Sequence, residues 1–414
     1  MISGKQATLE AGYSLEFPDR MITSLYIHVP FCAKRCEYCA FYSEPVKGGQ
    51  MDRYVLALIQ EIESQAQLVA PKTVFFGGGT PSLLTLSQWR RIFKSFAAVG
   101  WGSIEEFTVE CNPATVSAEK ARLLRDCGVN RISMGVQSMD EHLLDQLGRV
   151  HSRAMVFRSF QILRDAGFNN INLDLMFALP GQTLAVWDST LTEILEMGSE
   201  HLSCYEVIYE EDTLLFERLK AGEFVIDEDL ADEMYRLLVE RLNAAGFKQY
   251  EIANFVRSSS VPADGLPQYA CHHNINYWVG GEYLALGPAA AGHIDGQRYQ
   301  NWSNVDLYCD AVEEGKLPRD PGERLSPLAK ASETAAFWLR MNRGVDLDAF
   351  RRRTGFDFEQ NWAKEQEALV VRGWAERHEN FFRLTAEGFR FADAAGAELL
   401  RTASAENQAP MALN

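Results

Sequence analysis

Three cysteines crowd together near the start of the chain, within the segment from Tyr26 to Phe41. Cys32, Cys36 and Cys39 have the spacing Cys-x3-Cys-x2-Cys and follow a short apolar run that predicts a strand. Three thiolates can hold three irons of a cubane cluster and leave the fourth iron without a protein ligand, as chemistry at that iron requires. A zinc site is one alternative, but structural zinc takes four ligands and no second cysteine pair follows. A chance grouping of three reduced thiols is the other.

The remaining cysteines stand alone along the chain, which is not the pattern of a secreted disulfide framework. The first twenty residues lack a basic start followed by an apolar run, so no signal peptide is visible. No uncharged apolar stretch reaches the roughly 18 residues that a membrane span needs. These observations predict a cytoplasmic protein with no integral membrane segment, for which peripheral contact with a membrane through partners remains compatible.

Composition excludes several classes of protein. Of the 414 residues, 47% are apolar and 23% are charged, which is typical of a packed chain and not of whole-chain disorder. The 40 Lys and Arg residues against 57 Asp and Glu residues give a formal charge of −17. Such acidity argues against nucleic acid and against an anionic membrane surface as partners.

Short apolar runs alternate with amphipathic stretches over the first part of the chain. Predicted strands are 24–29, 73–77, 107–112, 131–137, 171–179 and 202–208, and predicted helices are 51–68, 87–98, 117–127, 153–167, 184–197 and 229–246. Six strand–helix units predict an α/β fold with a parallel sheet and right-handed crossovers, either doubly wound or closed like a barrel. Ser117 is the expected N-cap of its helix.

Candidate functional residues gather where these predicted strands end. Cys32 follows the first strand, the Gly77-Gly78-Gly79-Thr80 run follows the second, and Glu110 ends the third. Gln137 ends the fourth strand and Asp174 lies in the fifth. In parallel α/β sheets, ligands bind at the carboxyl ends of the strands, so these residues are expected to share one site.

The second part of the chain has a different pattern. A Ser-, Pro- and Gly-rich break at 257–268 predicts a loop or domain joint, and 271–301 is aromatic and glycine-rich without clean periodicity. Helical patterns then resume near Ala329 and continue through 345–354 and 357–371, before a hairpin at 374–384 and a last helix at 385–400. The predicted divisions are an N-terminal arm (1–20), a core (21–256), a connecting segment (257–325), a winged-helix-like domain (326–401) and a disordered tail (402–414).

The cysteine loop resembles the signature of the radical S-adenosylmethionine superfamily. That resemblance implies a partial (β/α)6 TIM-like barrel with a C-terminal winged-helix-like α+β module, and a [4Fe–4S] cluster on Cys32, Cys36 and Cys39. It also implies that S-adenosylmethionine binds the open iron and is cleaved to a 5′-deoxyadenosyl radical, with an electron donor such as flavodoxin or ferredoxin. The remaining motifs match the family in order along the chain. The residues that the resemblance assigns to S-adenosylmethionine are Tyr26, Tyr38, Gly78, Gly79, Thr80, Glu110, Gln137, Arg149 and Asp174.

Within that superfamily the chain is similar to oxygen-independent coproporphyrinogen III dehydrogenases and to their relatives, the HemW haem chaperones. The dehydrogenases carry an additional cysteine where this chain has Phe41, as HemW proteins do. The dehydrogenases also have a longer arm before the first strand. A His-Asn-x-x-Tyr-Trp motif, implicated in haem binding in HemW proteins, is present as His273, Asn274, Tyr277 and Trp278. All three features favour the chaperone branch.

The residues of this motif support two interpretations by themselves. An imidazole beside Tyr and Trp suits an axial haem ligand with aromatic walls. Equally, His273 suits a core histidine with satisfied hydrogen bonds, with Tyr277 and Trp278 as packing residues. His272 is a neighbouring candidate for the same role. Ala178 departs from the family pattern, which often has Gly before Leu-Pro-Gly.

The resemblance therefore predicts a haem chaperone that binds haem as cargo and passes it to haem-requiring acceptors such as respiratory proteins. The alternative is coproporphyrinogen III dehydrogenase, which converts propionates to vinyl groups by oxidative decarboxylation. Whether the radical chemistry is used stays open on the sequence, and so do the acceptor and the number of S-adenosylmethionine molecules. A plain electron carrier or zinc-binding module is a third interpretation, which predicts no binding of S-adenosylmethionine.

Overall fold

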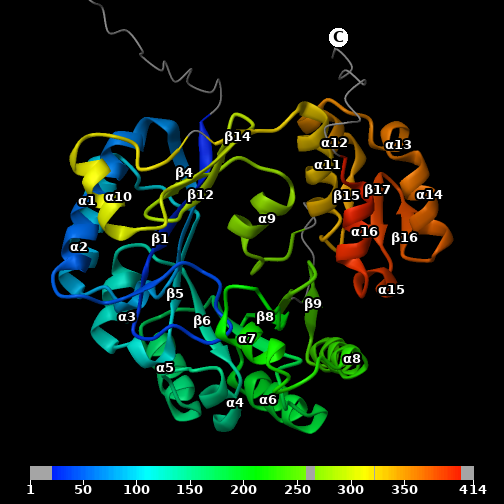
Figure 1. Cartoon of the computed structure of the whole chain (residues 1–414), viewed down its shortest axis with the longest axis horizontal. Helices are drawn as coiled ribbons and strands as arrows, with labels where there is room; N and C mark the ends of the chain where they lie inside the picture. The colour runs from blue at the N-terminus through cyan, green and yellow to red at the C-terminus, as the bar shows by residue number, and fades with distance from the viewer. Residues whose placement is uncertain (1–20, 258–265, 321, 402–414) are drawn as a thin grey trace, which may run out of the picture.

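The structure is a computed structural model that describes residues 21–257, 266–320 and 322–401. The expected arm at 1–20, the expected tail at 402–414 and residues 258–265 of the expected loop lie outside the described residues. Within the described part, one large α/β body carries a smaller α+β module at its side (Figure 1).

The body is built on one curved sheet with the strand order β11-β1-β4-β5-β6-β7-β8-β10-β9. The six central strands are parallel and confirm the six predicted strands. At one edge β11 joins parallel to β1, and at the other β10 and β9 join antiparallel. The strands are β1 (Ile22–Val29), β4 (Val69–Gly78), β5 (Glu106–Cys111), β6 (Arg131–Gln137), β7 (Ile171–Phe177), β8 (His201–Glu206), β9 (Phe247–Gln249), β10 (Asn254–Arg257) and β11 (Leu284–Leu286).

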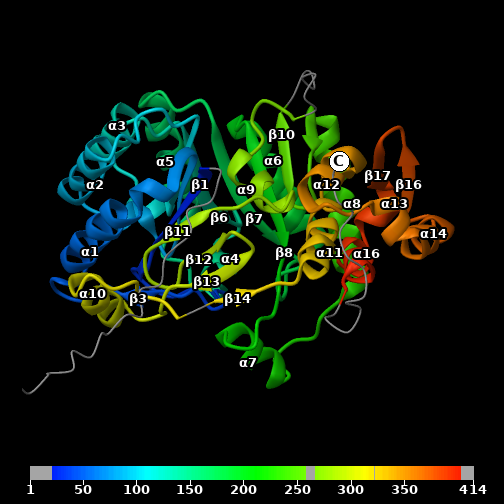
Figure 2. The ribbon, with the colours of Figure 1, turned by 90° about the horizontal axis from the view of Figure 1, so that it is seen from above.

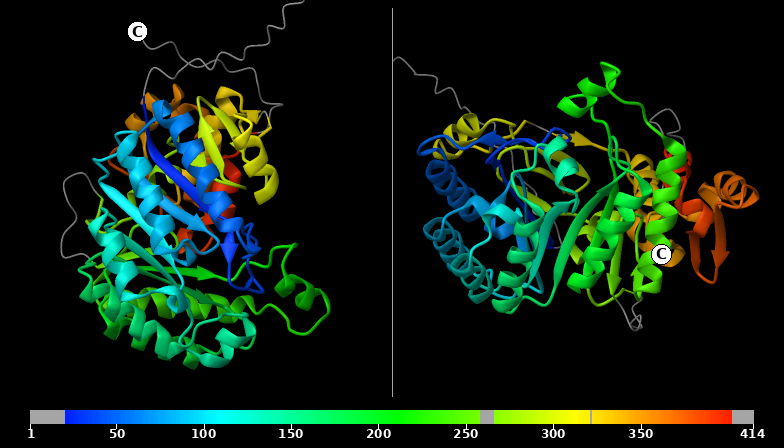
Figure 3. Two further views of the ribbon diagram at one scale, coloured as in Figure 1. Left: turned by 90° about the vertical axis from the view of Figure 1, so that its left-hand side faces the viewer. Right: turned by 90° about the horizontal axis from the view of Figure 1, so that it is seen from below.

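The sheet does not close on itself. In the described chain its edge strands β11 and β9 each have one neighbour, so the fold is a partial barrel, as expected from the resemblance. Figure 3 shows that the strands form one curved sheet. The strand β11 was not predicted, because it is three residues long and lies in a segment without clear periodicity.

Helices cover the outer face of the sheet, as Figure 2 shows from above. Each predicted helix of this part is present within a few residues, and Ser117 is the N-cap of α3 as predicted, accepting from the Lys120 amide. Two short helices, α4 and α7, were not predicted. The helices are α1 (Gln50–Gln65), α2 (Leu86–Ala98), α3 (Ala118–Asp126), α4 (Glu141–Gln146), α5 (Arg153–Asp165), α6 (Leu184–Met197), α7 (Leu214–Lys220) and α8 (Glu228–Ala244).

The two faces of the sheet differ in polarity. Apolar residues such as Leu25, Val74 and Ile132 face the helices and form the main core. Because successive side chains of a strand point to opposite faces, the alternate positions face the interior of the barrel. Those positions are largely polar, and include Ser24, Tyr26, His28, Thr73, Glu106, Thr108, Glu110, Arg131, Ser133, Asn172, Asp174, His201 and Ser203. A polar inner face leaves room for a cavity where a closed barrel would pack side chains.

The connecting segment returns across the body and is fastened by one buried carboxylate. Glu61 on α1 accepts hydrogen bonds from the Gly287 amide (2.8 Å), Asn301 Nδ2 (2.9 Å) and the Tyr308 hydroxyl (2.7 Å). These contacts hold β11 and the elements after it against α1. The segment contains α9 (His272–Trp278), β12 (Ala291–Ile294), β13 (Gln297–Gln300), α10 (Val305–Glu313) and β14 (Glu323–Arg324).

The C-terminal module has the expected winged-helix-like arrangement of helices with a small sheet, β15-β17-β16. The helix expected over 357–371 is interrupted at Trp362, and the last helix is divided in two at Phe391. An ion pair between Arg390 and Asp232 of α8 (2.6 Å) joins the module to the body. Its elements are α11 (Pro327–Trp338), β15 (Val345–Asp346), α12 (Leu347–Thr354), α13 (Phe358–Asn361), α14 (Ala363–Val371), β16 (Ala375–His378), β17 (Phe381–Leu384), α15 (Ala386–Phe389) and α16 (Ala392–Leu399). No described helix is long and apolar enough to cross a membrane.

Candidate functional site

The cysteine loop begins at the carboxyl end of β1. Its first residues form β2 (Phe31–Cys32), which pairs in parallel with β3 (Glu44–Pro45) where the chain leaves the loop. Cys32, Cys36 and Cys39 are partly exposed and all line one cavity of about 500 Å³, here called the outer cavity. The Cys32 thiol lies 3.6 Å from Thr80 Oγ1, which joins the loop to the glycine run after β4.

The glycine run packs directly against the cysteine loop. The Gly79 amide donates to the Val29 carbonyl (2.8 Å) and the Thr80 amide donates to the Phe31 carbonyl (2.7 Å). A Cβ at Gly79 would lie 2.6 Å from the Phe31 oxygen, so only glycine fits there. Gly78 has φ +102°, and a Cβ would meet the His28 ring at 2.4 Å. These glycines are thus required by the protein's own packing as well as by any ligand beside them.

Arg149 and Tyr38 lie together on another wall of the outer cavity. Arg149 donates to Cys36 Sγ (3.4 Å), the Tyr38 hydroxyl (3.5 Å) and the Gly135 carbonyl (2.5 Å). Gln137 lines the same cavity and has φ +69°, an uncommon value for a residue with a side chain. A register shift between Gly135 and Gln137 produces this local distortion at the end of β6. Ala178, after β7, also has positive φ (+58°), which explains why glycine suits that position.

Glu110 and Asp174 lie where the outer cavity meets a second, inner cavity, since both residues line both spaces. Burial, reinforced by the nearby Asp174 charge, raises the pKa of Glu110 to about 8. Burial also raises the pKa of Asp174, although hydrogen bonds from Asn172 and Ser133 oppose that shift. Two buried acids at this junction suit a ligand that carries a positive charge.

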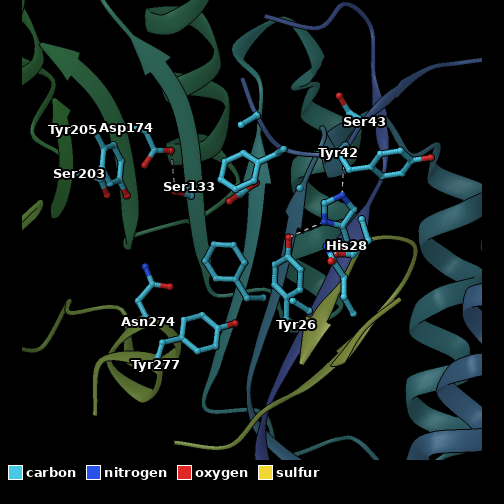
Figure 4. Close-up of a pocket in the computed structure, with 18 of the residues that line it drawn as sticks. Tyr26, His28, Tyr42, Ser43, Ser133, Asp174, Ser203, Tyr205, Asn274 and Tyr277 are labelled. Carbon is cyan, nitrogen blue, oxygen red and sulfur yellow. Dashed lines mark hydrogen bonds between the residues drawn. The ribbon is translucent and has the colours of Figure 1, made fainter. Parts of the chain in front are cut away.

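The inner cavity has a volume of about 820 Å³ and occupies the interior of the partial barrel. Figure 4 shows Tyr26 and His28 on one side and Asp174, Ser203 and Tyr205 on the other. The Tyr26 hydroxyl lies 3.0 Å from His28 Nδ1, and His28 Nε2 lies 2.9 Å from the Tyr42 carbonyl. Burial lowers the pKa of His28 to about 4, so its ring is neutral at physiological pH. Tyr26, predicted to contact S-adenosylmethionine, lines this inner cavity.

Helix α9 carries the His-Asn-x-x-Tyr-Trp motif and lies across the interior. Asn274 and Tyr277 face the inner cavity (Figure 4). His273 is fully buried, with Nδ1 2.9 Å from Thr73 Oγ1 and Nε2 2.6 Å from the Tyr277 hydroxyl. Burial, together with the charge of Arg131, lowers the pKa of His273 to about 3. In this structure His273 therefore has the surroundings of a hydrogen-bonded core histidine. Tyr277, whose hydroxyl contacts His273, is the residue of the pair that lines the cavity.

The other motif residues lie away from the cavity. The amides at the start of α9 are capped by Glu106 of β5, which accepts from His272 (2.7 Å) and His273 (2.9 Å). The His272 side chain lines a separate pocket near the amino ends of the strands. Trp278 contacts Phe337 of the C-terminal module and lies under Arg340, whose guanidinium carbon is 4.7 Å from its ring. The motif thus joins the cavity to the module.

Several cavity residues were missed by the sequence analysis. Arg131, Ser133 and Asn172 line the inner cavity, as do Ser203 and Tyr205. The sequence does indicate them, because they are polar residues at alternate positions of otherwise apolar strands. That signal shows that one strand face is polar, but not that these faces enclose a shared space.

The thiols of the outer cavity fit a cluster better than a single metal ion. In the part of the chain that the structure describes, no three His, Cys, Asp or Glu side chains are arranged around a single metal ion. The three loop thiols instead surround part of one cavity, an arrangement that suits a multi-iron group better than one zinc ion. Arg149 and the Thr80 hydroxyl, both beside the thiols, suit the negative charge of thiolates.

Comparisons with known proteins agree with this architecture. The Radical SAM superfamily matches residues 26–194 and the HemN C-terminal domain matches residues 325–391. The heme chaperone HemW of Lactococcus lactis is 34% identical over 88% of this chain and 94% of its own length. HemW of Bacillus subtilis is also 34% identical, over 88% of this chain and 96% of its own length. The structure of Escherichia coli coproporphyrinogen III oxidase (HemN) has a TM-score of 0.78 at 22% identity, and covers 93% of this chain and 91% of HemN.

The structural likeness to HemN shows the fold, and the sequence likeness to HemW shows the family. The radical S-adenosylmethionine fold implies a [4Fe–4S] cluster and S-adenosylmethionine as cofactors. The described cavity fits both, since it places a three-cysteine loop beside buried acids and a basic side chain. The chain belongs to the HemW family within the radical S-adenosylmethionine superfamily.

Proposed function

We propose that this protein is a haem chaperone, which binds haem in the inner cavity and passes it to a haem-requiring acceptor such as a respiratory protein. The observation that carries the proposal is the juxtaposition of two sites. Asn274 and Tyr277 of the His-Asn-x-x-Tyr-Trp motif line the inner cavity, and that cavity meets the cysteine-lined outer cavity at Glu110 and Asp174. Relatives named heme chaperone HemW support the same function.

In this proposal the outer cavity holds the cofactors. Cys32, Cys36 and Cys39 bind the cluster, and the Glu110 and Asp174 carboxyl groups face the amino or sulfonium group of S-adenosylmethionine, whose positive charge favours their ionised forms. The remaining contacts come from Tyr38, Gly78, Gly79, Thr80, Gln137 and Arg149, and Tyr26 acts from the inner side. The reduced cluster, when bound, would supply the electron for cleavage of S-adenosylmethionine. A flavodoxin or ferredoxin would deliver that electron to the cluster. The chain's own groups orient the ligand and restrict access of water.

The inner cavity provides the aromatic walls that a flat macrocycle needs. Tyr26 and Phe75 line the cavity and stack with ring centroids 6.3 Å apart, and the buried His273 ring stacks on Phe75 at 5.3 Å. Tyr277 and Tyr283, which also line the cavity, meet edge to face with ring centroids 4.5 Å apart. Two routes to haem iron follow from the contacts of His273. Either the Tyr277 hydroxyl is the contact, or Tyr277 moves aside and frees the Nε2 atom of His273.

The test is anaerobic reconstitution with iron and sulfide, followed by haem titration monitored by absorption. His273→Ala is expected to weaken haem binding on either route. Tyr277→Phe separates the routes, because it weakens binding if the hydroxyl is the contact and preserves or strengthens binding if His273 is. His201→Ala is the matched control, since His201 is equally buried, with both ring nitrogens paired by Asn172 and Tyr250.

Two outcomes would contradict the proposal. If the wild-type protein binds no haem, the proposal that it is a haem chaperone is wrong. Conversion of coproporphyrinogen III on the same samples, without stable haem binding, would make the protein a dehydrogenase instead. Circular dichroism melting of each variant shows whether a loss of binding reflects unfolding.

A further inference from the structure

Arg131 is an unusual residue for the wall of a cavity. It is the first residue of β6 and its side chain points into the barrel, where it lines the inner cavity. It is only 2% exposed, and among the described residues no other Lys or Arg is buried to the same degree. A buried guanidinium normally has several hydrogen bonds or a carboxylate partner, because its burial without them is costly.

Arg131 has no such partner within the described chain. No ion pair within 4.0 Å and no side-chain hydrogen bond joins its guanidinium to another residue, and its Nε atom is buried without an acceptor. The nearby acids have other partners. Glu106 caps α9, while Asp174 accepts hydrogen bonds from Asn172 and Ser133.

The side chain nevertheless remains charged. Burial works against the cation, but Cys271, Glu106 and other neighbours outweigh that effect and leave the pKa of Arg131 above its ordinary value. The cavity therefore contains a fixed positive charge with free hydrogen-bond donors, and the aromatic residues Tyr26, Phe75 and Tyr277 line the same cavity. A planar guanidinium binds carboxylates through two parallel hydrogen bonds, which suits it to this ligand group.

We propose that Arg131 binds a carboxylate of the cargo, so that the inner cavity selects a planar macrocycle bearing a propionate side chain over one that lacks it. This inference rests on the proposed haem-chaperone function and adds the part of the ligand that the cavity recognises. The Tyr26, Phe75 and Tyr277 rings, which line the cavity, contact the ring system of the cargo, and Arg131 fixes its orientation through one propionate. The cargo then enters with that propionate toward the amino ends of the strands, away from the cysteine loop.

The test compares haem with haem dimethyl ester, which has the same ring and iron but no free carboxylates. Wild-type protein is expected to bind haem at least about tenfold more tightly than the ester, because a hydrogen bond between charged groups contributes that much to affinity. Arg131→Gln is expected to lower haem affinity to that of the ester without changing affinity for the ester. Arg131→Lys keeps the positive charge but cannot form two parallel hydrogen bonds, so it is expected to retain part of the preference for haem over the ester.

Arg241→Gln, on the outer helix α8, is the control and should keep the full preference for haem over the ester.

Each outcome separates this inference from the proposed function. Equal binding of haem and ester by the wild type would overturn the role of Arg131 and leave the chaperone proposal intact, and this comparison needs no variant. An unchanged preference in Arg131→Gln would also overturn it. A variant that loses S-adenosylmethionine binding instead would assign Arg131 to the cofactor. Wild-type protein that binds neither haem nor ester would remove the chaperone proposal itself.

Discussion

The outer and inner cavities adjoin, yet they are built in different ways. The outer cavity is formed by one short loop and by the carboxyl ends of strands, so its residues lie in compact motifs such as Cys32 to Cys39. The inner cavity is formed by single side chains at alternate strand positions and by a helix that enters more than 130 residues after Arg131. A site built from local spacing is visible in a sequence, whereas a site built from many elements is not.

The largest effect is expected from the cysteines of the outer cavity. Cys32→Ser, Cys36→Ser or Cys39→Ser should abolish cluster retention after reconstitution, because each removes one of three thiolate ligands. Iron and sulfide analysis, together with visible absorption, measures the loss. Cys127→Ser, at the end of α3 and outside both cavities, is the control and should retain the cluster.

These variants also test how independent the two cavities are. If haem affinity is unchanged in Cys32→Ser, the inner cavity functions by itself. If haem affinity falls when the cluster is lost, the two cavities are built differently but do not function independently.

The next effect concerns the packing between the glycine run and the cysteine loop. Gly79→Ala should lower the free energy of unfolding by about 2–3 kcal/mol and reduce cluster retention, because its Cβ meets backbone that cannot move aside easily. Thermal melting and iron content are the measurements. Gly102→Ala is the matched control, since nothing lies within 4 Å of its added Cβ. Equal stability of the two variants would show that the loop is not held by this contact.

The smallest effect is the pH dependence from Glu110 at the junction of the cavities. Its pKa is raised to about 8 by burial and by Asp174, so the folded protein binds a proton that the unfolded chain releases above its ordinary pKa of about 4.5. The stability this contributes is fully present below pH 4.5 and is lost as pH rises through 8.

Glu110→Gln mimics the neutral form and lacks this titration. Its stability relative to wild type should therefore increase between pH 5 and pH 8, by on the order of 2 kcal/mol. Urea unfolding at several pH values checks this difference. Parallel stability curves for the two proteins would mean that Glu110 is ionised throughout, and that the junction is already negatively charged before a ligand enters.

Much of the fold followed from the sequence. Six strands and their helices were predictable because apolar runs with turn residues between them are local signals, and the cap at Ser117 depends on three residues only. The strand β11 was not predictable, since its pairing with β1 depends on contacts with residues more than 250 positions earlier. The break at Trp362 also depends on packing, because Trp362 is fully buried against Phe350 and Phe358.

The cysteine loop, the order of the strand-end motifs and the likeness to a family can be recognised from residue types at fixed spacing alone. Which side chains share a cavity depends on how the chain folds. The fold buries His273 between Thr73 and Tyr277, and it places Arg131 in the inner cavity with no ion-pair or side-chain hydrogen-bond partner among the described residues. The physical reason is that burial and pairing depend on distances between chain segments, and no local pattern specifies those distances.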